Sequence, residues 1–279
     1  MTESPLALPI VHPPRGRLPV LLSVPHAGRD YPDWLIAEAR HGLKSLQPLE
    51  DPFVDRLVWR ALGHGVGAVI AATPRAAVDC NRAEDEVDPA LVPGFRNAPP
   101  SVRARGGLGI VPSRTLAHGH LWRRRLSNAA LDRRLETAYR PYHAALERQL
   151  ADLAGTFGCA LLLDCHSMPP SKCGASVVFG DRYGRSAAPW LMSAAVDIAK
   201  ESGFVASVND PFAGGHILDR HAAPQSGVHA IQVEIDRRCY LTAQGEPGAQ
   251  FDAIADLLES LTVGLGELLL DRRLAAAAE

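Results

Sequence analysis

Six short apolar runs are spaced along the chain, and each has the length of a buried β-strand. They contain few polar residues, which is typical of strands that are covered on both faces of a sheet. The runs are 18–24, 66–72, 159–163, 175–179, 204–208 and 228–235.

Between these runs, five segments carry apolar residues at helical spacing, and we expect helices there. The segments are 33–40, 51–62, 124–155, 187–201 and 250–277. Asp33 is a candidate cap of the first, and Pro141 is expected to interrupt or kink the third. Strands that alternate with helices predict a three-layer α/β/α fold with a mostly parallel or mixed central sheet.

The segment 84–113 breaks this alternation. It contains five prolines and four glycines, so we expect a long irregular excursion. Loops of this length are often functional, which makes an active-site flap a reasonable interpretation. We otherwise expect one domain over residues 1–279, because α/β chains of this length often form one.

Composition narrows the functional classes. The net charge is −2, so no basic excess indicates nucleic acid or an anionic membrane as a partner. No apolar run approaches the roughly 20 residues that span a bilayer, and residues 1–17 lack the pattern of a signal peptide. The five cysteines, Cys80, Cys159, Cys165, Cys173 and Cys239, form no C-x-x-C pair. We therefore expect a cytoplasmic protein with reduced thiols.

Two histidines follow predicted strands. His26 comes after the run 18–24 and Pro25, and His166 follows the run 159–163 with Asp164 two residues before it. Strand ends are where sites assemble in open α/β sheets, and neutral imidazole is the commonest protein metal ligand. Asp164 is then a candidate to fix the tautomer of His166. The alternative for His26 is a tight turn with a surface histidine.

A carboxylate is needed to complete a catalytic metal site, and Glu50 and Asp51 stand at the start of the second helical segment. Two histidines and one carboxylate leave a coordination position open for water, as in catalytic zinc sites. Asp51 is equally suited to cap the helix, since aspartate is among the best N-cap residues.

Gln232 and Glu234 share one face of the otherwise apolar run 228–235. A carboxylate is costly to bury without a partner, so Glu234 is expected either to act as a general base or to pair with a cation. Arg237 and Arg238 are the nearby candidates for such an ion pair.

The pair Asn81-Arg82 is a candidate to bind a carboxylate or to polarise a carbonyl, and a surface loop is the alternative. Two further clusters, 139–143 and 214–221, carry weaker signals on their own. A Gly-Gly pair in the second indicates that backbone approaches something closely.

Together these segments resemble the N-formylglutamate amidohydrolase family, and they keep the family's order over most of the chain. The matching motifs are SVPHAG at 23–28, EDPFVDRL at 50–57, DCNR at 79–82, RPYHAAL at 140–146, DCHSM at 164–168, GGHILDRHA at 214–222 and QVEIDRRCYL at 232–241.

The resemblance implies a zinc-carboxypeptidase-like fold (phosphorylase/hydrolase-like), shared with aspartoacylases, and a divalent metal, Zn²⁺ or another ion. It implies His26, His166 and a carboxylate as metal ligands, with the motif alignment favouring Asp51 over Glu50. Glu234 would be the general acid/base, with Arg82 stabilising the oxyanion. The implied substrate-binding residues are Asn81, Arg82, His143 and Arg220.

The implied reaction is hydrolysis of an N-formyl or N-acyl amino acid, with N-formyl-L-glutamate as the implied substrate. The segment around Arg220 departs from the family pattern, because Asp219 could partly neutralise Arg220 and Ala222 replaces a tyrosine. Alternatives are another N-acyl amino acid or a peptide as substrate, or a non-catalytic binding protein on the same scaffold. The oligomeric state has no signature in the sequence.

Overall fold

The computed structural model describes residues 4–95, 100–170 and 174–278. They group into two compact units, each built from several segments. The sheet unit comprises residues 11–24, 51–69 and 145–279, and the loop-rich unit comprises 1–10, 25–50 and 70–144. Because the segments of the two units interleave along the chain, the expected single domain over 1–279 stays a prediction.

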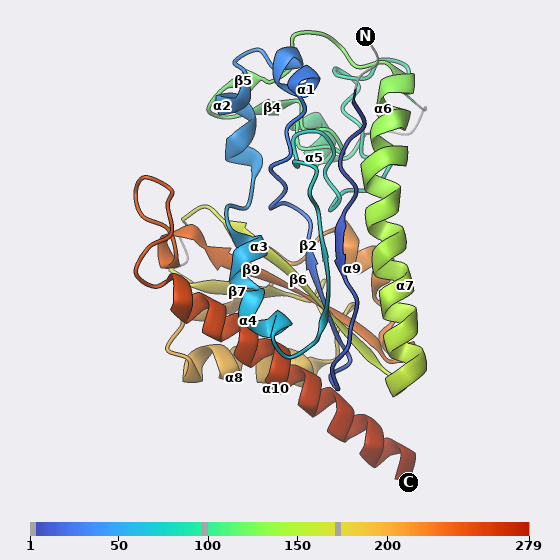
Figure 1. Ribbon diagram of the computed structural model, residues 1–279, viewed down its shortest axis with the longest axis vertical. Coiled ribbons are helices and arrows are strands. Elements are labelled where there is room, and N and C mark those ends of the chain that lie inside the picture. The colour runs from blue at the N-terminus through green and yellow to red at the C-terminus, as the bar shows by residue number, and fades with distance from the viewer. Residues whose placement is uncertain (1–3, 96–99, 171–173, 279) are drawn as a thin grey trace. The chain divides into compact units, whose positions relative to one another are not determined.

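A seven-stranded mixed sheet forms the centre of the sheet unit, in the order β1-β3-β2-β6-β9-β7-β8 (Figure 1). Strands β2, β6 and β9 run parallel, β7 is antiparallel to β9, and β8 is parallel to β7. The strand bounds are Ile10–His12 (β1), Val20–Val24 (β2), Gly67–Ile70 (β3), Ala160–Met168 (β6), Val177–Gly180 (β7), Ala206–Val208 (β8) and Val228–Asp236 (β9).

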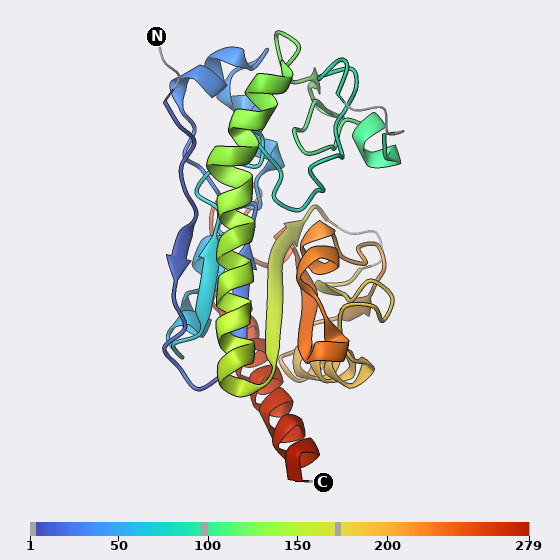
Figure 2. The same cartoon turned by 90° about the vertical axis from the view of Figure 1, so that its right-hand side faces the viewer.

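Helices cover both faces of this sheet. Figure 2 shows α7 in front of the strands and α10 behind them. Helix α10 (Phe251–Ala278) packs against α8 (Pro189–Glu201) and against α4 (Trp59–Leu62). A Cβ at Gly266 of α10 would lie 2.8 Å from the Val20 side chain, so glycine lets the helix approach β2. This arrangement confirms the predicted three-layer α/β/α architecture.

The loop-rich unit contains mainly short elements. They are α1 (Asp33–Glu38), α2 (Leu43–Leu46), a 3₁₀ turn at Gln47–Leu49, α5 (Val102–Arg105), the hairpin strands β4 (Arg114–Thr115) and β5 (Gly119–His120), and α6 (Asn128–Arg134). The excursion at 84–113 is irregular apart from α5, as expected, although its residues 96–99 lie outside the described residues. Its role as a flap stays a prediction.

All six predicted strands are present, with shifted ends. Strand β6 continues five residues beyond its apolar run, through Asp164 and His166 to Met168. The remaining helical elements are α3 (Val54–Leu57), α7 (Arg140–Phe157) and α9 (His216–His221), with 3₁₀ turns at Pro224–Ser226 and Arg237–Cys239. Helix α9 was not expected from the sequence.

Two predicted helix starts are wrong in detail. Asp33 is the first residue of α1, and Pro32 occupies the cap position. The helix expected over 51–62 is two short helices, α3 and α4, that meet at Val58. Phe53, with φ of 60°, occupies the cap position of α3. That left-handed backbone cannot continue a helix, so Asp51 lies before the helix and is not its cap.

The interruption expected from Pro141 takes the form of a π turn. Residues Leu135–Tyr139 form this turn between α6 and α7, and the Arg140 N–H donates to the Leu135 carbonyl. Proline lacks an N–H and its ring crowds the carbonyl four residues earlier, so the wider turn accommodates Pro141.

The free cysteines are Cys80, Cys159, Cys165 and Cys239, and Cys173 lies outside the described residues.

Candidate active site

A row of polar side chains crosses one face of the sheet near the carboxyl ends of its parallel strands. Ser23 on β2 is in register with Asp164 on β6, and Asp164 with Gln232 on β9. Two residues further on, His166 is in register with Glu234. All five are at least nine-tenths buried. Alternate residues of a strand face the same side, so the strand geometry alone gathers these groups.

His166 lies between two carboxylates. Its Nε2 is 2.8 Å from Oδ2 of Asp164, and its Nδ1 is 3.1 Å from Oδ2 of Asp51. Burial by itself lowers the pKa of His166, but the charge of Asp164 and the hydrogen bonds to both carboxylates outweigh it. The pKa is therefore held well above its ordinary value. Ser23 donates to the other oxygen of Asp164 at 2.7 Å.

Asp51 is also held by an arginine. Arg237 donates from Nη2 to Oδ1 of Asp51 at 3.1 Å and from Nε to the Ser167 hydroxyl, also at 3.1 Å. One oxygen of Asp51 thus faces the arginine while the other faces His166. Its neighbour Glu50 accepts a hydrogen bond from the Tyr31 hydroxyl at 2.6 Å, and the pKa of Tyr31 is raised by burial and by this bond.

His26 has a similar carboxylate partner. Its Nε2 is 2.7 Å from Oδ1 of Asp79, a residue that is itself buried. Burial raises the pKa of Asp79, but Arg75, His26 and Arg82 outweigh this, so that its pKa lies well below the usual range. Asp79 is therefore an anion that orients the imidazole of His26. The alternative of a surface histidine is wrong, because His26 is only 3% exposed.

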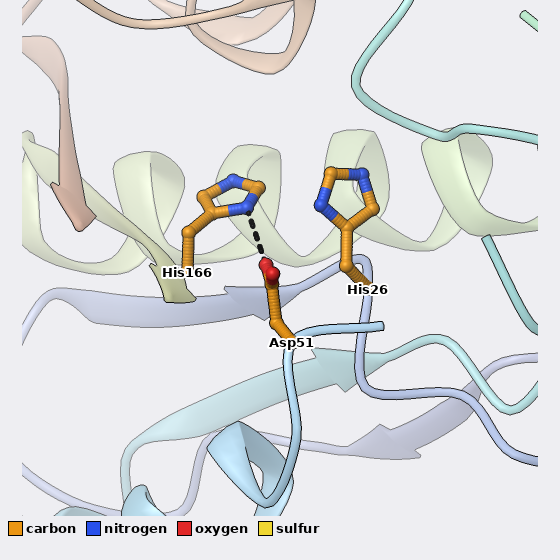
Figure 3. Close-up of side chains that lie close together, drawn as sticks. All are labelled: His26, Asp51 and His166. Carbon is orange, nitrogen blue, oxygen red and sulfur yellow. Dashed lines mark hydrogen bonds and ion pairs between the residues drawn. The ribbon is translucent and has the colours of Figure 1, made fainter. Parts of the chain in front are cut away.

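His26, Asp51 and His166 can each offer one ligand atom to a metal ion, and these three atoms lie within 4.8 Å of one another. Figure 3 shows the three side chains, with the hydrogen bond between His166 and Asp51 as a dashed line. In both histidines Nε2 faces a carboxylate, and Nδ1 of His166 faces Asp51, the third member of the set.

Glu234 accepts a hydrogen bond from Nε2 of Gln232 at 2.9 Å. Of the two arginines expected as alternative partners, Arg237 pairs with Asp51 and Arg238 pairs with Asp236. The charge of Glu234 also contributes to the raised pKa of His166. Glu234 is therefore a buried carboxylate beside a histidine of the candidate ligand set.

The loop that carries Asn81 and Arg82 is fixed by hydrogen bonds. Arg82 donates from Nε to the Leu108 carbonyl at 3.0 Å and from Nη1 to the Asn81 carbonyl at 2.7 Å. The backbone N–H of Asn81 donates to Asp79 at 2.8 Å. Burial lowers the pKa of Arg82, an effect that Asp79 opposes. Asn81 and Arg82 are both buried, so the alternative of a surface loop is wrong.

The motif around His143 supports this loop from the helix beside it. The Tyr139 hydroxyl donates to the Arg82 carbonyl at 2.8 Å, and Nε2 of His143 lies 3.0 Å from the Cys80 carbonyl. The rings of Tyr139 and His143 are in contact, with centroids 4.4 Å apart, and both side chains are fully buried. These contacts indicate that His143 positions the loop, and its contact with substrate stays a prediction.

Arg220 lies on the exposed face of α9. The expectation that Asp219 neutralises it is wrong, since both oxygens of Asp219 bind Arg182, at 2.7 Å and 2.6 Å. Among the residues that the structure describes, Arg220 forms no hydrogen bond or ion pair, so its guanidinium is available to an anionic ligand.

Sequence reasoning missed three residues of this site: Asp79, Arg237 as a partner of Asp51, and Tyr31. Asp79 stands two residues before Asn81, and nothing in the sequence links it to His26, 53 residues away. Asp164 could be predicted from the sequence as a partner of His166, because the two residues share a strand face.

No helix within 4–95, 100–170 or 174–278 is long and apolar enough to cross a membrane.

The fold and the site define an α/β protein whose mixed sheet carries a buried histidine and carboxylate site at its carboxyl edge. The model of the N-formylglutamate amidohydrolase family matches residues 18–241. The chain is 32% identical over 268 residues to an N-formylglutamate deformylase of Pseudomonas putida, covering 91% of this chain and 92% of that protein.

A second N-formylglutamate deformylase, from Pseudomonas aeruginosa, is 30% identical over 264 residues, again covering 91% of this chain and 92% of the relative. The crystal structure of N-formylglutamate amidohydrolase from Ralstonia eutropha JMP134 superposes with a TM-score of 0.87 at 29% identity, covering 95% of this chain and 99% of that one. The chain belongs to the N-formylglutamate amidohydrolase family.

Proposed function

We propose that this chain hydrolyses N-formyl-L-glutamate to formate and L-glutamate with the aid of a bound divalent metal ion. The names of its relatives support the substrate. The observation that carries the metal is the cluster of His26, Asp51 and His166, whose ligand atoms lie within 4.8 Å of one another.

The chemistry of this donor set fits a catalytic zinc site. Two imidazoles and one carboxylate leave a coordination position for water. Each imidazole has a carboxylate on its far nitrogen, Asp79 for His26 and Asp164 for His166, and such partners orient metal-binding histidines and raise their basicity. Other first-row divalent ions prefer similar ligands, and Zn²⁺ is the ion we propose.

When bound, the metal would lower the pKa of a coordinated water toward neutrality and polarise the substrate carbonyl. In the proposed reaction Glu234 takes a proton from the attacking water and delivers it to the leaving amine nitrogen. The hydrogen bond from Gln232 holds the Glu234 carboxylate in position for this transfer. Arg237 orients Asp51.

Arg82 is proposed to stabilise the negative charge that develops on the carbonyl oxygen, because a buried guanidinium on a fixed loop is already oriented for it. Asn81, Arg82 and Arg220 are proposed to bind the substrate, with an arginine taking a substrate carboxylate. His143 is proposed to contribute through the position of the Asn81-Arg82 loop.

The test is formate release from N-formyl-L-glutamate by the purified protein, as isolated, after chelation, and after zinc is restored. We expect release that chelation abolishes and zinc recovers. Release that is indifferent to chelation, with metal removal verified by elemental analysis, would refute the metal. A metal-loaded protein that releases no formate but cleaves other N-acyl amino acids would refute the substrate.

A further inference from the structure

A cavity of about 390 Å³ lies within the loop-rich unit, and none of the residues proposed for catalysis lines it. Its apolar wall includes Trp34, Leu91, Trp122 and Leu126. Its polar wall comprises the run Arg123–Arg125 together with Glu38 and Arg134. Neither His26, Asp79 nor Arg82 lines it. The volume is within the range of roughly 300–1,000 Å³ that is typical of small-molecule sites.

The arginine run is held on a fixed backbone. Trp122 bridges to Ala39 beyond the end of α1, and the Arg123 N–H donates to the Glu38 carbonyl at 2.9 Å. On the other side, the Leu126 N–H donates to the Leu91 carbonyl, also at 2.9 Å. The segment that follows β5 is thus tied to the end of α1 on one side and to residue 91 on the other. The backbone that carries the arginines is therefore fixed, which lowers the entropic cost of ordering this wall around a ligand.

Positive charge dominates this wall. The Arg123 side chain donates to the carbonyls of Ala37 and Ala39, and therefore helps to hold the arginine run in place. Arg124 and Arg125 are exposed, and neither makes a hydrogen bond or ion pair with any other residue in the described part of the chain. The cavity is consequently lined by two consecutive arginines beside an apolar hollow.

The acidic residues near this wall are already engaged. Glu38 pairs with Arg134 at 2.9 Å. Asp88 accepts from the Ala90 N–H at 2.9 Å and from the Ser113 hydroxyl. A second hollow of about 280 Å³ shares the same three arginines and adds Arg40 and His120, which extends the cationic lining. The surroundings therefore leave the charges of Arg124 and Arg125 uncompensated.

We propose that this cavity binds a small amphiphilic organic anion. A carboxylate or phosphate head would lie on Arg124 and Arg125, whose planar guanidinium groups match both head groups. The apolar body would enter the hollow between Trp34, Leu91 and Trp122. A polyanion such as nucleic acid would use the arginines but leave the apolar wall without a role. This binding site is separate from the proposed catalytic function and does not depend on it.

The test is isothermal titration of the full-length protein with four probes: phenylacetate, phenyl phosphate, 2-phenylethanol and inorganic phosphate. We expect at least one aromatic anion to bind with a Kd below about 1 mM, and the neutral alcohol and inorganic phosphate to bind at least about tenfold more weakly. The two aromatic anions identify the preferred head group. An absence of binding by both would overturn the proposal.

The double variant Arg124→Gln/Arg125→Gln assigns the binding to this cavity. We expect its Kd for the preferred anion to rise at least about tenfold, with an unchanged melting temperature because both side chains are exposed. Arg148→Gln, an exposed arginine on α7, is the matched control and should leave the Kd unchanged. An unchanged Kd in the double variant, or displacement of the anion by N-formyl-L-glutamate, would overturn the proposed site.

Discussion

His166 donates from Nε2 to Oδ2 of Asp164, 2.8 Å away and two residues earlier on the same strand. The two side chains meet because alternate residues of a strand face the same side of the sheet. The bond fixes the orientation of the imidazole and so directs Nδ1 toward Asp51. His26 and Asp79 form an equivalent pair between residues far apart in sequence.

The first prediction concerns the pair of Asp164 and His166. Asp164→Asn should weaken zinc binding by about 10–100-fold, because the amide cannot carry the charge that raises the basicity of His166. Competition with a chromogenic chelator measures the affinity. Asp152→Asn, an exposed change on α7, is the control. Unaltered zinc affinity in Asp164→Asn would show that the carboxylate does not tune the ligand.

Glu234→Gln tests the general base. The amide keeps the size of the side chain but cannot accept a proton, so kcat for formate release should fall by about 10²–10⁴-fold. Metal content should stay at the wild-type level, since Glu234 is not in the proposed ligand set. Elemental analysis and the formate assay on the same preparation separate the two effects. A variant that retains near-full turnover would remove Glu234 from the mechanism.

Tyr139→Phe tests whether the helix beside the Asn81-Arg82 loop positions Arg82. The change removes the hydroxyl that donates to the Arg82 carbonyl at 2.8 Å and keeps the ring that packs on His143. We expect kcat to fall by about tenfold because Arg82 becomes less well oriented, with unchanged metal content.

Thermal unfolding of Tyr139→Phe serves as its control. A melting temperature that falls in proportion to the activity would indicate a purely structural role for the hydroxyl. A loss of kcat in a protein that melts near the wild-type temperature supports positioning.

Gly28→Ala should destabilise the protein by about 1–3 kcal/mol. A Cβ at this position would lie 2.2 Å from the Thr73 carbonyl oxygen and 2.6 Å from that of Ala72, and backbone atoms cannot easily move aside. The N–H of Asp30, two residues further on, donates to the Ala72 carbonyl at 3.1 Å, which holds the two segments together. Denaturant unfolding measures the change.

Gly155→Ala is the matched comparison for Gly28→Ala. Gly155 lies within α7, and an added Cβ would meet nothing within 4 Å. Alanine costs less backbone entropy than glycine in a helix, so this variant should be more stable by about 0.5–1 kcal/mol. Equal effects of the two alanine substitutions would contradict the steric explanation.

Several features of this protein could be read from the sequence because they depend on local pattern. Apolar runs are needed wherever a strand is buried on both faces, and all six such runs form strands. His166 and Asp164 were paired correctly because a strand repeats every two residues. The interruption before Pro141 follows from the chemistry of one residue.

Other features depend on contacts between residues distant in the chain, and only the tertiary structure decided them. Asp51 and Glu50 were both candidate ligands by sequence. The structure separates them, because Arg237 orients Asp51 beside His166 while Tyr31 holds Glu50. The ion pair of Asp219 with Arg182 likewise spans 37 residues.

The sequence by itself determined the strands, the histidines that follow or end them, and the family motifs, since each is set by neighbouring residues. Tertiary structure decided which carboxylate contacts each histidine and how Tyr139 supports Arg82. It also decided that Phe53, and not Asp51, occupies the cap position of α3. The physical reason is that a hydrogen bond depends on distance in space, and local pattern does not encode that distance across long stretches of chain.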